Sequence, residues 1–445
     1  MARALAGLLF ALLLGCAGVS SVARAADSTA SASREAAAPS AVTLAEAGKL
    51  LASGQIVAAP QLVEWLAQAG EGGSQRDFLD GMISYSAKDY RRAEAMFRRI
   101  LDREPRLVRV RLELARTLYM EKKDEQADYH FSLAAAEHPS PQVMRNITNF
   151  RDAIRTRRSW RFNIDFGFAP DSNINSATDK ESVDIHGLPF RLDPAARSQS
   201  GTGRFVGGDA SLRLNRFGQV PIYIGGYGRW VRFNDRRFDD AYAGLEAGPE
   251  FALGGGHLRT MATGLIRWYG KRPLVSSAGA RLEYEKLIGD EWNIGGTLLL
   301  RHNDYAQRRD LDGWDVEARA SASRPLGLTT LGFADAGIER SQANDPGQAF
   351  WRGRIGVGAV KEIGWGLRPQ LRLDFARQVN DGPLAPFGKQ RQDWLLEGSF
   401  SIYKRDWNVE GFAPSLSVTA TWNYSTLSLY NERRLRGEVR LTKAF

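Results

Sequence analysis

The spacing of apolar residues changes at Arg158, and this change constrains the fold more than any other feature of the chain. Before it, apolar side chains recur every three or four residues, the pattern of amphipathic helices. After it, they alternate with polar residues and form one apolar face of a strand, as in Trp160, Phe162, Ile164, Phe166 and Phe168. The sequence therefore predicts a helical domain over 43–157 and a domain of strands over 158–445.

The links between the alternating segments indicate the kind of sheet. About fourteen strands fit the sequence, with long links at 170–203, 233–240 and 378–391 and short ones at 217–219 and 289–291. Bacterial outer-membrane barrels have an even number of strands, short periplasmic turns and long outer loops. We therefore predict a roughly 14-stranded antiparallel outer-membrane β-barrel behind a periplasmic helical domain. The link 403–411 is longer than a periplasmic turn should be.

Aromatic residues favour the membrane interpretation over a soluble sandwich with a buried apolar face. Ten of the eleven tryptophans follow Arg158, many of them near strand ends, where membrane interfaces favour them. The mean hydropathy of −0.35 is compatible with a barrel, because apolar and polar residues average out along its strands. The terminal Phe445 resembles the insertion signal of outer-membrane proteins, which makes the barrel assembly machinery an expected partner.

The N-terminus has the features of an export signal. Arg3 precedes an apolar stretch, and Ala23 and Ala25 form an A-x-A cleavage pattern, so we expect a signal peptide over 1–25. Cys16, the one cysteine, follows Leu-Leu-Gly and loosely resembles a lipoprotein processing site, which leaves lipidation open as the second interpretation. The Ala- and Ser-rich segment 26–42 reads as a linker.

A 34-residue repeat, the period of tetratricopeptide units, runs through the helical domain. It relates Gly81 to Ala115, Ala93 to Ala127, Phe97 to Phe131 and Pro105 to Pro139. Small residues let the two helices of a unit approach, the Phe fills the gap between them, and the Pro closes the second helix. We expect these eight residues to pack the helical core, with the weaker segments 44–69 and 141–154 capping it.

Three segments carry a resemblance to a known family: LARTLY (114–119), RRSWRFNIDFGFAPDSNIN (157–175) and LYNERRLRGEVRLTKAF (429–445). They resemble the surface lipoprotein assembly modulators, or Slam proteins, the translocons of type XI secretion. The resemblance covers most of the chain. It implies a periplasmic tetratricopeptide domain and a fourteen-strand barrel that moves client proteins to the cell surface. The implied partners are a client, either a surface lipoprotein or a secreted effector, and periplasmic chaperones. This chain departs from the family in its short helical region.

By the tetratricopeptide resemblance, the concave face of the helical domain is where a client would bind. It runs through Phe78, Met82, Tyr85, Leu112, Arg116 and Tyr119. These six residues are the candidate client-binding site.

The family segment after the first strand has two interpretations. Asp171, Ser172, Asn173, Ile174 and Asn175 form the sequence DSNIN, in which the Asp, Ser and Asn residues are ordinary turn formers that bond their own backbone. The alternative is a role in the lumen or at an opening of the barrel. A basic set of loop residues likewise either binds lipopolysaccharide phosphates or is simply solvated: Arg232, Arg236, Arg237, Arg308 and Arg309.

Other classes of function find little support in the sequence. The net charge of +9 comes without a basic block or zinc-ligand spacing, so we expect no nucleic-acid partner. The five histidines show no ligand spacing and no serine lies in a nucleophile elbow, so we expect no enzyme, no metal and no cofactor. We expect a monomeric barrel.

Two other functions compete with the translocon. A tetratricopeptide-coupled polysaccharide export porin should have sugar-stacking aromatics among acidic residues in its lumen and a long repeat array. A passive porin or adhesin would have no need of a partner-binding helical domain.

Overall fold

The structure is a computed structural model that describes residues 73–137, 139–157, 160–214, 220–289, 291–363, 366–404, 407 and 412–444. These residues belong to one compact unit, Gly54–Phe445. The expected signal peptide, the linker, the flanking segment 44–69 and Phe445 lie outside the described residues.

The helical region contains five described helices. They are α4 (Ser74–Ser86), α5 (Tyr90–Arg103), α6 (Val108–Met120), α7 (Asp124–Ala135) and α8 (Pro141–Arg157). The turns after α4 and α6 have the same backbone form: Lys88 and Lys122 both have a φ of 63°. Each turn caps its helix with the same bonds, such as Asp89 N to Ser84 O and Lys123 N to Leu118 O, both at 2.9 Å. The 34-residue repeat is therefore repeated in the backbone. None of the described helices is long and apolar enough to cross a membrane.

The repeated small and aromatic residues form the helical core, as predicted. Ala93, Ala127, Phe97 and Phe131 are at most 1% exposed. A Cβ atom on Gly81 would lie 2.7 Å from the ring of Phe97, so only glycine lets α4 and α5 approach this closely. The helices α5 and α7 end before Pro105 and Pro139, which lie outside them.

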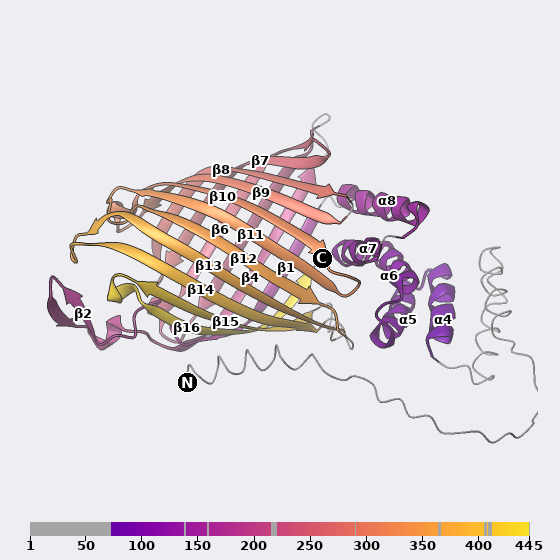
Figure 1. Ribbon diagram of the computed structural model, residues 1–445, viewed down its shortest axis with the longest axis horizontal. Coiled ribbons are helices and arrows are strands. Elements are labelled where there is room, and N and C mark those ends of the chain that lie inside the picture. The colour runs from indigo at the N-terminus through magenta and orange to yellow at the C-terminus, as the bar shows by residue number, and fades with distance from the viewer. Residues whose placement is uncertain are drawn as a thin grey trace, which may run out of the picture. The chain divides into compact units, whose positions relative to one another are not determined.

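The rest of the described chain forms a closed antiparallel barrel of fourteen strands (Figure 1). The strands are β1 (Trp160–Asp171), β4 (Gly201–Leu214), β5 (Ile222–Arg232), β6 (Asp240–Leu253), β7 (Gly256–Tyr269), β8 (Arg272–Ile288), β9 (Trp292–Tyr305), β10 (Gly313–Pro325), β11 (Thr330–Ala343), β12 (Phe350–Lys361), β13 (Leu367–Leu384), β14 (Lys389–Lys404), β15 (Ala413–Ser425) and β16 (Glu432–Ala444). Each strand pairs with its neighbour in the chain, and β1 pairs with β16 to close the ring. The predicted fold class is confirmed.

The outer face of the barrel is apolar, as a membrane-spanning barrel requires. Along β1, Trp160, Phe162, Phe166 and Phe168 are between 39% and 55% exposed. Several other tryptophans near strand ends are 41% to 51% exposed: Trp230, Trp292, Trp314, Trp351 and Trp394. Side chains that alternate with these residues point to the lumen. The barrel is therefore an outer-membrane barrel with its aromatic side chains in the interfacial positions that the sequence indicated.

A small hairpin, which was not predicted from the sequence, lies at one end of the barrel (Figure 1). It consists of β2 (Ser182–Ile185) and β3 (Leu188–Arg191), within the long link between β1 and β4. Val183 is 4% exposed and packs against Leu384, Phe387 and Leu427 from two later loops. The long first link is therefore a structured loop with a small core of its own.

Long strands leave short links at two places in the barrel, one of which the sequence predicted to be a long link. The link predicted at 378–391 is mostly strand, since β13 runs to Leu384 and β14 begins at Lys389. The register shifts between Val379 and Pro383, which marks an irregularity where β13 leaves the barrel wall. The strand β8 likewise begins at Arg272, so that only Gly270 and Lys271 connect it to β7.

Candidate functional site

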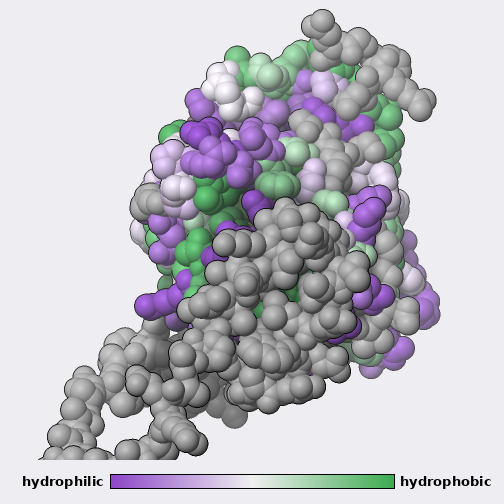
Figure 2. Space-filling view, turned by 90° about the vertical axis from the view of Figure 1, so that its right-hand side faces the viewer, coloured by the Kyte–Doolittle hydropathy of each residue, from purple (hydrophilic) through white to green (hydrophobic). Residues whose placement is uncertain are grey.

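The six residues predicted to bind a client lie on two helices whose spacing places them on matching faces. Phe78, Met82 and Tyr85 recur at intervals of four and three on α4, as do Leu112, Arg116 and Tyr119 on α6. All six are half-buried. The five apolar ones pack against one core cluster. We call these six residues the client strip. Figure 2 views the molecule from the helical end and shows hydrophobic residues bordered by hydrophilic ones.

Aromatic contacts extend the client strip onto a third helix. The ring of Tyr119 lies 5.2 Å from that of Phe150 on α8, and the guanidinium of Arg116 lies 5.9 Å from the Phe150 ring. Burial, followed by the nearby Tyr90, raises the pKa of Tyr85 above its usual value, so its phenol stays neutral in the periplasm. From the sequence, the segment that forms α8 was expected only to cap the helical repeat. The intervals of four and three between Val143, Ile147 and Phe150 were the signal for this apolar face.

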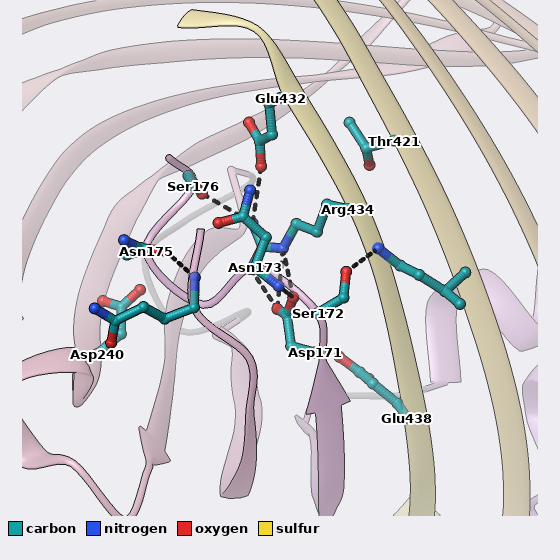
Figure 3. Close-up of polar contacts among 12 residues, drawn as sticks. Asp171, Ser172, Asn173, Asn175, Ser176, Asp240, Thr421, Glu432, Arg434 and Glu438 are labelled. Carbon is teal, nitrogen blue, oxygen red and sulfur yellow. Dashed lines mark hydrogen bonds and ion pairs between the residues drawn. The ribbon is translucent and has the colours of Figure 1, made fainter. Parts of the chain in front are cut away.

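The DSNIN segment forms a network of hydrogen bonds at the end of β1 (Figure 3). The Asn173 side chain, 1% exposed, accepts a bond from Ala177 N at 3.0 Å and donates one to Ala177 O at 2.8 Å. Asn175 bridges to the far end of the same loop, where it donates to Arg197 O at 2.8 Å and accepts from Gln199 N at 2.9 Å. These bonds support the interpretation that the segment is a turn bonded to its own backbone.

The same segment also joins the first strand to the last. Asp171 is paired with Arg434 of β16, with an Nη2–Oδ2 distance of 2.6 Å. Leu435 N donates to Ser172 Oγ at 2.8 Å, and Ser172 N donates to Leu435 O at 3.0 Å. Ile174 and Asp171 line a cavity of about 460 Å³ together with Arg229, Arg436 and Tyr269 from the barrel wall. The segment therefore closes the barrel seam and borders the lumen at once.

The lumen is lined by arginines paired with carboxylates from other strands, which lie one to three places away in the ring. Arg229 pairs with Glu438 at 2.9 Å, Arg281 with Glu246 at 3.0 Å and Arg301 with Asp315 at 3.1 Å. Guanidinium groups cover several aromatic rings: Arg229 lies 4.1 Å from the Phe205 ring centre and Arg259 lies 5.3 Å from that of Tyr223. One face of each of these two rings is therefore covered by a guanidinium group.

Four of the five basic residues lie in links between strands, and Arg232 is the last residue of β5. Arg236 and Arg237 belong to a short 3-10 turn, η3 (Arg236–Phe238), and Arg309 begins another, η4 (Arg309–Leu311). Two of the five have a carboxylate next to them, Asp235 at 2.7 Å from Arg237 and Asp310 at 2.5 Å from Arg308. All five arginines are exposed.

Comparisons with known proteins agree with this architecture. A family model described as "Surface lipoprotein assembly modifier" matches residues 160–445, and one described as its N-terminal TPR repeats matches residues 73–131. "Surface lipoprotein assembly modifier 1" of Haemophilus influenzae is 23% identical, covering 82% of this chain and 75% of that protein. Its namesake in Neisseria meningitidis is 25% identical, covering 83% and 75%.

A further relative and a solved structure are more distant. "Hemophilin secretion modulator" of Acinetobacter baumannii is 21% identical, covering 79% of this chain and 75% of that protein. The outer membrane channel DcaP of the same organism aligns with a TM-score of 0.37 and 10% identity, covering 64% of this chain and 96% of that one. The two family models together span the described helical repeat and the whole barrel. The chain belongs to the surface lipoprotein assembly modifier family.

Proposed function

We propose that this protein is an outer-membrane translocon that moves client proteins from the periplasm to the cell surface. One observation carries the proposal: a chain of this family joins a tetratricopeptide domain to a closed barrel. The client strip holds apolar segments of an unfolded client, and the barrel supplies the route or the surface for its passage. Clients are surface lipoproteins or related secreted proteins, the two classes named for the relatives.

The chemistry of the client strip suits an unfolded protein better than a folded one. Phe78, Met82 and Tyr119 offer adaptable apolar surface, and Met side chains reshape readily around different partners. Arg116 adds one cation on the same face and is held by Glu113 at 3.3 Å. Such a surface binds many apolar segments without a fixed sequence, as the capture of several clients requires.

The lumen favours a protein client over a polysaccharide. Polysaccharide export relies on open aromatic faces, whereas guanidinium groups cover Phe205 and Tyr223. Alternating cations and anions offer hydrogen bonds to a polypeptide backbone without selecting one charge. We therefore retain polysaccharide export only as the second candidate.

We further propose partners and a mode of action around this core function. Periplasmic chaperones deliver the client, and the barrel assembly machinery inserts the barrel, which acts as a monomer and without enzymatic chemistry. Outside the membrane, Arg232, Arg236 and Arg309 contact lipopolysaccharide phosphates. Folding of the client at the cell surface supplies the free energy, because a folded client does not return through the barrel.

A deletion of residues 43–155 tests the proposed function. Barrel strands satisfy their backbone bonds among themselves, so the barrel should still insert and shift its gel mobility on heating. Surface display of an epitope-tagged surface lipoprotein that is co-expressed with this chain should be lost. The comparison uses cells with matched barrel levels. Undiminished display in the deletion would remove the helical domain from the mechanism.

A further inference from the structure

A buried ion pair joins the helical domain to a turn of the barrel. Arg111 of α6 has a side chain that is 1% exposed, and its Nη1 lies 2.8 Å from Oε2 of Glu362, whose side chain is 11% exposed. Glu362 follows β12 directly, in the turn to β13. The two residues are 251 positions apart, within the single compact unit Gly54–Phe445.

The surroundings of Arg111 are built for one carboxylate. Its Nη2 donates to Pro105 O at 2.8 Å, and its Nη1 lies 3.1 Å from Nδ1 of His130. Arginine only donates, so this Nδ1 is the acceptor and the imidazole proton resides on Nε2. That Nε2 lies 3.9 Å from Oε1 of Glu362. The histidine and the arginine therefore face the same carboxylate.

The contact leaves almost no free space. The cavity between the two parts measures about 10 Å³ and is lined by Leu101, Leu114 and Ile363 as well as the charged groups. That volume admits no more than about one water molecule. A second contact lies nearby, where the guanidinium of Arg368 on β13 is 4.2 Å from the ring centre of Tyr129 on α7. The ion pair, the close apolar packing and the cation–π contact therefore all lie at the β12–β13 turn.

This docking point adds a second anchor to the helical domain. The first lies where α8 ends at Arg157 and β1 begins at Trp160, and Arg161 of β1 also lies 3.5 Å from Glu125 of α7 there. The second lies at the β12–β13 turn, and β13 is four strands round the ring from β1, past β16, β15 and β14. One anchor lets a domain pivot, whereas two separated anchors fix its orientation. If either charge is removed, its partner loses this opposite charge while it stays buried, which makes the docking strongly dependent on both residues.

We propose that Arg111 and Glu362 are positioning residues for export, whose ion pair docks the helical domain on the β12–β13 turn and so holds the client strip in a fixed relation to the barrel. This inference rests on the proposed function. Neither residue contacts the client. Loss of the pair frees the helical domain to pivot on the α8–β1 link, and a captured client is then no longer presented to the barrel.

Cross-linking measures the docking directly. Pro105→Cys and Ile363→Cys place one thiol on each side of the cavity, and a short bis-maleimide joins them in whole cells. Glu362→Gln and Arg111→Glu should each reduce the cross-linked fraction by at least about tenfold. Arg111→Glu combined with Glu362→Arg should recover a large part of it. The matched control is Lys122→Glu, at an exposed position in the turn after α6, which should change nothing.

Surface display of the tagged lipoprotein then tests the role in export. We expect display to fall with the cross-linked fraction in Glu362→Gln and Arg111→Glu, and to return in the charge-swapped pair. Heat-dependent gel mobility and protease resistance of the helices confirm that each variant is folded and inserted. A variant that is undocked yet displays its client normally overturns this inference. Normal display in the 43–155 deletion overturns the proposed function instead, so the two failures are distinguishable.

Discussion

The carboxylate of Asp171 on β1 is held by two nitrogens of Arg434 on β16, with Nη2–Oδ2 and Nε–Oδ1 distances of 2.6 and 3.0 Å. These are the first and last strands of the barrel, so the pair closes its seam. The paired register of β1 and β16 skips Ala169 and Pro170 just before it. Proline has no N–H to donate to the ladder, and the side-chain pair holds the strands together beyond that gap.

Asp171→Asn should therefore weaken the seam. A charged, bidentate hydrogen bond to a buried carboxylate contributes about 1.5–3 kcal/mol, and we expect a loss of that order. The measurement is the temperature at which the unboiled barrel loses its fast gel mobility. Arg433→Ala is the matched control, because that side chain is exposed on the same strand. Equal heat resistance in Asp171→Asn and the native protein would show that the seam does not depend on this pair.

The stability of the helical domain should depend on pH through Glu121. Burial and a hydrogen bond to Glu94 raise the pKa of Glu121 to about 7, above its usual 4.5. The folded domain thus binds this proton more tightly than the unfolded chain. Its contribution to stability is complete below about pH 4.5 and is lost as the pH rises through 7.

The measurement for Glu121 is the melting of the helical circular-dichroism signal in the detergent-solubilised protein. The melting temperature should fall between pH 5 and pH 8. Glu121→Gln should flatten that dependence, since the amide does not titrate. The control Glu137→Gln changes an exposed side chain just after α7 and should leave the pH dependence as it is. If the melting temperature depends on pH as steeply in Glu121→Gln as in the native protein, another group causes the pH dependence.

The topology can be read by thiol labelling from outside intact cells. Ser182→Cys lies on the exposed side of the β2–β3 hairpin and should label at once. Leu326→Cys, at a turn residue that is 55% exposed at the opposite end of the strands, should label only after the outer membrane is opened. The parent protein is the control, because Cys16 is its one cysteine and lies in the predicted signal peptide. The reverse labelling pattern would show that the barrel has the opposite orientation in the membrane.

The sequence predicts most clearly those elements in which the same environment constrains every residue of a face. The lipid bilayer imposes an apolar side chain at every second position, so β1 is visible from Trp160 to Phe168. The repeat is visible for a similar reason, since Gly81 and Ala115 meet the same steric limit in successive units. Periodicity of this kind needs no knowledge of distant contacts.

Elements that depend on distant contacts escape such an analysis. The strands β2 and β3 have four residues each, and Val183 is buried in a cluster with Leu384, Phe387 and Leu427, all more than 200 positions later. Arg111 lies in a helix rich in arginine and looks like a surface residue. Its burial depends on Glu362, which sequence spacing does not connect to it. The extension of β13 to Leu384 is hidden by Gly382 and Pro383, which suggest a turn.

The client strip gives the sharpest test of the helical domain, because its two tyrosines are half-buried at the edge of the core and not fully inside it. Tyr85→Asp with Tyr119→Asp places two charges among the half-buried apolar residues and should repel an unfolded client. Aromatic anchors commonly contribute 2 kcal/mol or more, so client capture should weaken by more than about tenfold. Capture is measured by cross-linking the tagged lipoprotein to the helical domain in cells, alongside its surface display.

The buried residues Ala93, Phe97, Ala127 and Phe131 stay unchanged in this double variant, so the repeat should keep its fold. An unaltered circular-dichroism melt checks that point, and the milder pair Tyr85→Ser with Tyr119→Ser serves if the Asp variant melts early. Lys122→Asp, at an exposed position in the turn after α6, is the matched control for added acidic charge. Capture at the native level in a folded double variant would move the client-binding site away from this face, because no client segment could pack there without meeting the two carboxylates.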